Sequence, residues 1–181
     1  MPPTTSPTMS PITSLIMSRA ALRSFYLSVS AVVIVGDRIT KLLIRRHVAL
    51  YFGNVTVIPH FFSITHVENT GAAFSLFAEW PQHVRLPLLV GFSALAMVVV
   101  CYLLWNSVKR FTWSGLALAL ILGGAVGNLY DRIRYGRVTD FLHFYIGPHM
   151  WPDFNLADSA IVIGATLLAL GLLFGGRAHD N

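Results

Sequence analysis

Two aspartates, Asp140 and Asp158, lie in and just after the polar stretch that separates the last two long apolar runs of the chain. An ionisable side chain at the edge of a hydrocarbon core costs about 3 kcal/mol on insertion scales, so two of them require a compensating role. When two carboxyl groups come within hydrogen-bonding distance, one keeps its proton and the other stays ionised. The ionised group can take a proton from water that attacks an amide carbonyl, and the protonated group can supply the leaving amine. The pair is therefore a candidate dyad for peptide-bond hydrolysis.

Amide and charged side chains accompany the two aspartates at spacings that suit a helix. Asn155 and Asp158 are three residues apart at the start of the last apolar run, so a helix would place them on one face. Asn128 and Asp131 repeat this spacing at the end of the preceding run, and Arg132 follows directly. Two helix ends are thus expected to bring polar groups to the same membrane face. The alternative is that the acids only form ion pairs in a solvated loop, with Arg132, Arg134 and Arg137.

Two further pairs in the apolar runs predict contacts of their own. Asp37 and Lys41 are one helical turn apart in the first run and are expected to form an ion pair at the level of the candidate dyad. Gly123 and Gly127 form a small-xxx-small step in the third run, which favours the close approach of a neighbouring helix.

Other hydrolytic chemistry has weaker support in the sequence. No histidine stands beside Ser63 or Ser159, and neither a G-x-S-x-G elbow nor an H-E-x-x-H helix occurs. His143 and His149 lie near Asp140 and leave a metal site open as an alternative, although surface histidines are the ordinary explanation. We therefore expect neither a metal nor another cofactor.

The composition is that of an integral membrane protein. Of 181 residues, 55% are hydrophobic and only 12% are charged, whereas about 25% are charged in soluble proteins. The net charge of +5 comes from scattered basic residues that form no block for a polyanion, so no nucleic-acid partner is expected. The single cysteine, Cys101, falls inside an apolar run and is expected to be a small buried hydrophobic residue.

Four segments approach the roughly 20 apolar residues that a bilayer core requires. A signal peptide is the alternative for the first segment, but basic residues follow it in place of a small-residue cleavage site. An even number of spans puts both termini on one side, and the short basic loop at Lys109 and Arg110 indicates that this side is cytoplasmic, although the opposite face also carries arginines. The expected spans are 20–44, 86–104, 111–129 and 157–174.

The remaining segments are a leader and a small sheet. Residues 1–18 are rich in Ser, Thr and Pro and are expected to be disordered, with Met1, Met9 or Met17 as the start. Residues 19–181 are expected to form a single membrane-embedded domain. Between the first two spans, alternating apolar and polar residues predict short strands within 51–80, with a turn at 69–71, on the outer membrane surface.

Four blocks of residues, taken together, resemble one family: the bacterial lipoprotein signal peptidases, or signal peptidase II. Their order and spacing match from the first apolar run to the last, and only the leader departs from the pattern. The blocks are DRITK at 37–41, NTGAAF at 69–74, the run from Gly123 through Val138-Thr139-Asp140-Phe141, and FNLAD at 154–158.

The resemblance implies a fold and a set of site residues. The fold is an all-α membrane protein of four transmembrane helices, with a small extracytoplasmic β-cradle between the first and second. Asp140 and Asp158 match the catalytic dyad of the family. The residues that match positions lining or bracing the site are Asp37, Lys41, Asn69, Gly71, Asn128, Asp131, Arg132, Asn155 and Ala157.

The resemblance also implies an activity, which is the removal of signal peptides from prolipoproteins by cleavage before a diacylglyceryl-modified cysteine. It implies a monomer of the bacterial inner membrane, with its site at the periplasmic face and inhibition by globomycin-type cyclic peptides. Two other classes stay open on the residues alone. A proton-coupled transporter would carry its acids near mid-bilayer, and a noncatalytic membrane subunit would use polar residues only to lock helices together.

Overall fold

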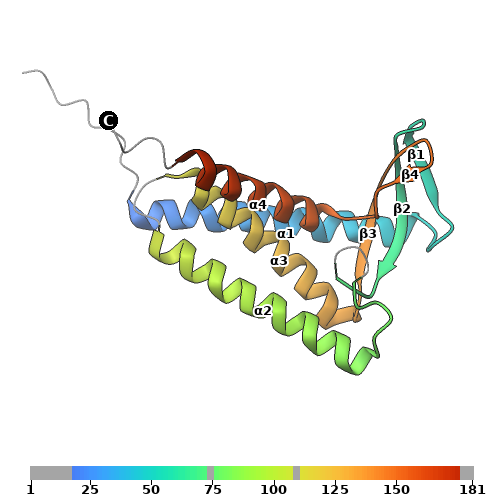
Figure 1. Cartoon of the computed structure of the whole chain (residues 1–181), viewed down its shortest axis with the longest axis horizontal. Helices are drawn as coiled ribbons and strands as arrows, with labels where there is room; N and C mark the ends of the chain where they lie inside the picture. Colours follow the sequence, from blue (N-terminus) through green and yellow to red (C-terminus); the bar gives the residue numbers. More distant parts are fainter. Residues whose placement is uncertain (1–17, 73–75, 108–110, 176–181) are drawn as a thin grey trace, which may run out of the picture.

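The computed structural model describes residues 18–72, 76–107 and 111–175. Four helices lie side by side, and a small sheet closes one end of them (Figure 1). Residues 1–17 of the predicted leader, its alternative start sites and the basic loop at Lys109 and Arg110 lie outside the described residues.

Each predicted span is contained within one helix, apart from the first two residues of 111–129. The helices are α1 Arg19–His47, α2 Gln82–Ser107, α3 Trp113–Tyr135 and α4 Leu156–Gly175. Helix α1 begins where the Ser18 side chain accepts a hydrogen bond from the Ala21 amide, and α3 ends at Gly136, whose φ of 71° suits glycine. Helices α1, α2 and α3 extend beyond the ends of their apolar runs, because polar residues next to those runs continue the helix.

Among the described residues, three helices are long and apolar enough to cross a membrane: Gln82–Asn106, Trp113–Tyr135 and Leu156–Phe174. The expectation of four spans is thus confirmed for three. Helix α1 is not among them, and it carries Asp37, Arg38 and Lys41 in its second half.

The sheet is antiparallel, in the order β1-β2-β3-β4. The strands expected from the alternating pattern are confirmed as β1 Asn54–Ile58 and β2 Phe62–Asn69. The expectation that the sheet lies wholly between the first two helices is wrong. Strands β3 Val138–Ile146 and β4 His149–Met150 lie in the connection between α3 and α4. They belong to the same sheet because β3 pairs with the edge of β2 that β1 leaves open.

Helix α3 lies at the centre of the bundle and packs against each of the other three helices. Three of its glycines allow close approach: a Cβ atom at Gly123 would meet Ser30 of α1, one at Gly124 would meet Ala157 of α4, and one at Gly127 would meet Asp37. The packing role predicted for the small-xxx-small step is confirmed.

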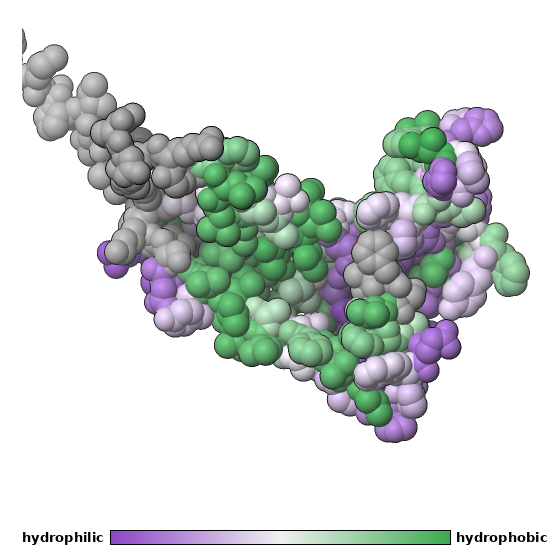
Figure 2. Space-filling model, viewed as in Figure 1, coloured by the Kyte–Doolittle hydropathy of each residue, from purple (hydrophilic) through white to green (hydrophobic). Residues whose placement is uncertain are grey.

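The outer surface of the helices is strongly apolar. Figure 2 shows hydrophobic surface over the bundle and hydrophilic surface in the hollow where the bundle meets the sheet. Cys101 lies on the outer surface of α2 and is exposed, so the expectation that it is buried is wrong. An apolar face of a membrane helix needs no protein partner, and for this reason an apolar run does not by itself predict burial.

Candidate active site

Asp140 lies in β3 at the centre of the sheet, and its side chain points to the end of the helix bundle. It is 2% exposed. Its Oδ2 accepts a hydrogen bond of 3.0 Å from Asn69 Nδ2 on the neighbouring strand. Its Oδ1 accepts one of 2.6 Å from Asn155 Nδ2. Two amides on separate segments therefore hold the Asp140 carboxyl in place.

Asp158 lies in the first turn of α4, where Asn155 is the residue that caps the helix. The Asp158 amide donates to Asn155 Oδ1 at 2.9 Å, and the Asn155 amide donates to Asp158 Oδ2 at 3.3 Å. This reciprocal pair is a capping box, which satisfies two amides at the start of the helix. Asp158 Oδ1 also accepts a hydrogen bond of 2.7 Å from Asn128 Nδ2 on α3.

Asn155 is the residue that joins the two aspartates. It is fully buried, its side chain donates to Asp140, and its backbone amide donates to Asp158. The same Nδ2 lies 3.3 Å from Asn128 Oδ1. The prediction that two helix ends bring these polar groups to one place is confirmed by this geometry.

Burial raises the pKa of the Asp140 carboxyl to about 7, and the negative charge of Asp158 acts in the same direction. The hydrogen bonds from Asn69 and Asn155 and the positive charge of Lys41 act in the opposite direction. Near neutral pH, Asp140 can therefore hold a proton while it lies close enough to Asp158 to sense its charge.

A cavity of about 720 Å³ opens beside the two aspartates. Its polar lining includes Asn69, Asn128, Arg132, Asp140 and Asp158. The rest of the lining is mainly apolar and comes from α2, α3 and α4, from Val138, from Ala72 and Phe77 before α2, and from the segment 151–154, which includes Asp153. A molecule with an amide group and a long apolar part would place the amide against the polar residues and the apolar part against the rest of the cavity.

Lys41 lies behind the candidate dyad in a fully buried cluster of charges. Its Nζ is 2.9 Å from Asp37 Oδ2 and 2.8 Å from Asp131 Oδ2, and it donates to Asn128 Oδ1 at 3.1 Å. The predicted ion pair between Asp37 and Lys41 is confirmed. Asp131 is a second partner, so two carboxylates contact the one ammonium group.

The two carboxylates of this cluster also connect it to its surroundings. Asp37 Oδ1 accepts a hydrogen bond of 3.2 Å from the backbone amide of Ala157 at the start of α4. Asp131 Oδ1 accepts from Arg38 at 2.7 Å and from Arg45 at 3.3 Å. Sequence reasoning gave no role to Arg45, although positions 38, 41 and 45 share one helical face and could have indicated it.

Gly71 and Arg132 connect the sheet to α3. The Gly71 amide donates to Asn69 Oδ1 at 2.9 Å and closes the predicted turn, while the Gly71 carbonyl accepts from Arg132 Nη2 at 3.2 Å. All eleven residues singled out from the sequence thus lie in one region around the two aspartates. The positions Ala73 and Phe74 of the same block lie outside the described residues.

The arginines do not neutralise the candidate dyad as the solvated-loop alternative requires. Within the described residues, no arginine forms an ion pair with Asp140 or Asp158. Arg137 pairs instead with Glu68 at 3.4 Å.

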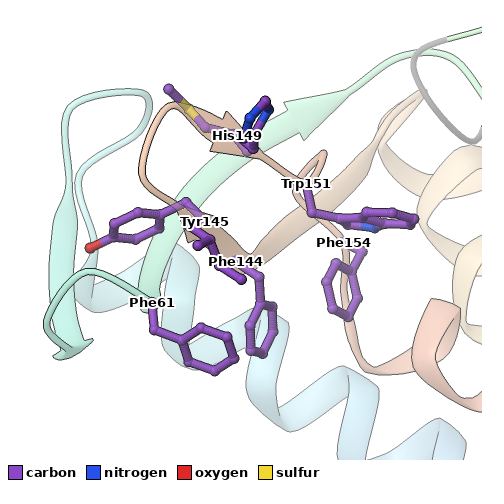
Figure 3. Close-up of a pocket in the computed structure, with 8 residues that line it drawn as sticks. Phe61, Phe144, Tyr145, His149, Trp151 and Phe154 are labelled. Atoms are coloured by element: carbon purple, nitrogen blue, oxygen red, sulfur yellow. The ribbon is translucent and has the colours of Figure 1, made fainter.

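An aromatic pocket of about 440 Å³ lies beside the cavity, on the sheet. Figure 3 shows that Phe61, Phe144 and Phe154 extend to the same side of the sheet. Trp151 and Phe154 line this pocket and the larger cavity, so the two spaces adjoin. Of the aromatic residues in the polar stretch, Phe144, Tyr145 and Trp151 line the pocket, whereas Phe141 is buried.

The histidines near Asp140 do not converge on a common point. In the part of the chain that the structure describes, no three His, Cys, Asp or Glu side chains gather as a metal site would require. His143 contacts Asp153 instead. The sequence alone had named His143 only for the metal-site alternative.

Comparison with known proteins places this arrangement in a family. The family described as signal peptidase (SPase) II matches residues 29–174. The lipoprotein signal peptidase of Solibacter usitatus is 41% identical over 84% of this chain and 93% of its own length. That of Sulfurihydrogenibium sp. is 45% identical over 78% of this chain and 86% of its own length.

The fold agrees with this match. A solved bacterial membrane enzyme superposes with a TM-score of 0.78 at 26% sequence identity, over 87% of this chain and 93% of that one. A second such structure gives a TM-score of 0.75, over 83% and 94%. The chain is thus an integral membrane protein with the fold of a bacterial membrane enzyme. More specifically, it belongs to the signal peptidase II family of proteases.

Proposed function

We propose that this protein is an aspartic endopeptidase that removes the signal peptide from prolipoproteins, with Asp140 and Asp158 as its catalytic dyad. The substrate class follows from the names of its relatives, which are lipoprotein signal peptidases. The observation that carries the catalytic assignment is the set of contacts made by Asn155, which bridges the two carboxyl groups beside a cavity.

The two aspartates take different roles in this mechanism. Asp140, whose pKa is raised to about 7 mainly by burial, holds the shared proton. Asp158 lies in the first turn of α4, accepts a hydrogen bond from the Asn128 amide and takes the role of the base. The Asp158 carboxylate takes a proton from water, the oxygen of which attacks the scissile carbonyl. Asp140 stabilises the developing oxyanion and then protonates the leaving amine.

The cavity supports a substrate that is partly peptide and partly lipid. We infer that the scissile bond lies at its polar end, just before a diacylglyceryl-modified cysteine. Two acyl chains hold a peptide stably in a membrane, because each buried CH₂ contributes about 0.8 kcal/mol. Holding the bond at the depth of the dyad also lowers the barrier through orientation.

The helices support a four-span arrangement in the bacterial inner membrane. Helix α1 packs along α3 with Asp37 and Lys41 buried in the protein interior, so these charges do not meet lipid. We propose α1 as the fourth span, with the chain termini in the cytoplasm and the site at the periplasmic face. A monomer contains the whole site, and a globomycin-type cyclic peptide is expected to compete for the cavity.

The position of the acids separates this function from proton transport. A transporter was expected to carry them near mid-bilayer, whereas Asp140 lies on a strand outside the helices and Asp158 in the first turn of α4.

The test compares carboxylate-to-amide variants in detergent micelles with a diacylglyceryl-modified prolipoprotein as substrate. Asp140→Asn and Asp158→Asn should each lower the cleavage rate by about 10³-fold or more, because an amide can neither act as a base nor share the proton. The matched control is Glu79→Gln, an exposed acid before α2, which should cleave at the normal rate. Normal cleavage by either aspartate variant, or loss of activity with chelators that zinc restores, would refute the dyad.

A further inference from the structure

Asp153 lies in the segment 151–155, which connects β4 to α4, and its side chain points back to the sheet. Thr65 Oγ1 on β2 donates to Asp153 Oδ2 at 3.0 Å. His143 Nδ1 on β3 contacts the other oxygen, Oδ1. The His143 and Asp153 side chains are 19% and 15% exposed, so water has limited access to this contact. Two strands of the sheet are thus joined to the segment through one carboxylate.

The next residue along the chain is attached to the sheet through its backbone. The amides of Phe141 and Leu142 lie 2.9 and 2.8 Å from the Phe154 carbonyl, and the Phe154 amide donates to Leu142 at 3.2 Å. Phe141 directly follows Asp140, so the segment lies against β3 beside the candidate dyad.

The residue after Phe154 is Asn155, which bridges Asp140 and Asp158. Its contact with Asp140 Oδ1 is 2.6 Å and its contact with Asp158 Oδ2 is 3.3 Å. Both contacts depend on where the segment holds Asn155. A displacement of about 1 Å in a catalytic group costs on the order of 100-fold in rate. The contacts of the Asp153 side chain therefore influence the positions of both aspartates.

We propose that Thr65, His143 and Asp153 form a positioning clamp that holds Asn155 between the two aspartates. The clamp rests on the proposed function of this site. None of its three residues touches the reacting atoms; they act through the backbone of the segment 151–155. Removal of the clamp loosens the dyad without unfolding the sheet, because Phe154 keeps its backbone hydrogen bonds to β3.

The experiment measures kcat, KM, the pH profile of kcat and thermal unfolding for Asp153→Ala, Asp153→Asn and Thr65→Val, in micelles. The expected result is a kcat about 10- to 100-fold lower with KM within about threefold of wild type, since orientation and not binding is lost. The alkaline limb of the profile should move to higher pH, because the Asn155 hydrogen bond lowers the pKa of Asp140. Thr65→Ser keeps the hydroxyl and should restore kcat.

Two further variants separate the clamp from a general effect on the sheet. Ser63→Ala removes a side-chain contact of 3.4 Å between β2 and Tyr145 of β3 that does not involve the segment, and it should leave kcat and the pH profile unchanged. In an Asn155→Ala background, Asp153→Ala should add little further loss, because the clamp acts through Asn155.

The clamp is overturned if Asp153→Ala and Thr65→Val lower only the unfolding temperature. It is also overturned if the fold-losses in kcat of Asp153→Ala and Asn155→Ala multiply in the variant that carries both substitutions. If Asp153→Ala does not fold, Asp153→Asn and Thr65→Val decide by the same measures. Failure of the wild-type enzyme to cleave the prolipoprotein, or normal cleavage by Asp140→Asn, would overturn the proposed function and the clamp with it. Normal wild-type behaviour with inactive Asp140→Asn and unaffected clamp variants would overturn the clamp alone.

Discussion

Lys41 on α1 and Asn128 on α3 form a buried hydrogen bond of 3.1 Å between Nζ and Oδ1. This bond fixes the orientation of the Asn128 amide, since the oxygen faces the ammonium group and the NH₂ group faces Asp158 at 2.7 Å. The Asn128 amide therefore links Lys41 to the proposed base, Asp158, through two hydrogen bonds. The packing of α1 against α3 is thus linked directly to the chemistry of α4.

Replacement of Lys41 by Met should destabilise the protein by about 3 to 5 kcal/mol, because it leaves the buried Asp37 carboxylate without its cationic partner, whereas Asp131 keeps Arg38 and Arg45. Thermal and denaturant unfolding in detergent would measure the loss. Arg46→Met, at an exposed position of the same helix, is the control and should change stability by no more than about 0.5 kcal/mol. A Lys41→Met variant as stable as this control would contradict the prediction.

Asp37→Asn should be milder than Lys41→Met. Loss of the Asp37 charge does not leave Lys41 unpaired, because Asp131 Oδ2 still lies 2.8 Å from Nζ. The new amide oxygen can also keep the hydrogen bond from Ala157. The same unfolding measurements should therefore rank Asp37→Asn between wild type and Lys41→Met, and the reverse order would show that Asp37 is the main partner of Lys41.

Asn128→Ala should lower kcat by about 10- to 100-fold and leave KM nearly unchanged. It removes the donor to Asp158, and a hydrogen bond to a charged group contributes about 1.5 to 3 kcal/mol. Single-turnover and steady-state cleavage of a prolipoprotein would separate the two constants. A higher KM with normal kcat would indicate that Asn128 serves substrate binding instead.

The rate of cleavage should fall as the pH rises through about 7. The pKa of Asp140 is raised from its ordinary value to about 7, mainly by burial. Below this pH the group carries the proton that the mechanism needs, and above it both aspartates become ionised. A profile of kcat between pH 5 and 9 tests this direction. A rate that rises steadily across pH 7 would contradict the assignment of the proton to Asp140.

Cleavage should depend on the lipid attached to the substrate. The cavity joins a polar end to apolar walls from three helices, so acyl chains are expected to hold the scissile bond at the level of the dyad. The comparison uses one peptide with and without diacylglycerol, in the same micelles and at saturating concentration. Equal cleavage of both peptides would show that the lipid is incidental.

The two ends of the helix bundle should lie on opposite sides of the membrane. Asn106 lies at the end of α2 and Pro148 in the turn between β3 and β4, at opposite ends of the bundle (Figure 1). Reporter fusions at these two positions should report the cytoplasm at Asn106 and the periplasm at Pro148. Matching signals from the two fusions would refute the proposed topology.

Much of this arrangement could be predicted from the sequence because it depends on local spacing. Long apolar runs predict membrane helices, and three of the four meet the criteria for a span. Positions three or four apart on a helix share a face. The ion pair of Asp37 with Lys41 and the shared face of Asn155 and Asp158 could therefore be predicted from spacing alone. The four sequence blocks, read together, also predicted the family correctly.

Only the tertiary structure decided which distant segments meet. Strand β3 pairs with β2, so that Asp140 lies opposite Val67, and no local period specifies a pairing between segments so far apart in the chain. Asp153 contacts Thr65 and His143 for the same reason. Cys101 faces outward although its neighbours are apolar, because lipid solvates an apolar helix face as well as protein does. Hydropathy determines which segments enter the membrane, whereas long-range backbone pairing and close helix packing determine which polar groups come together to form the site.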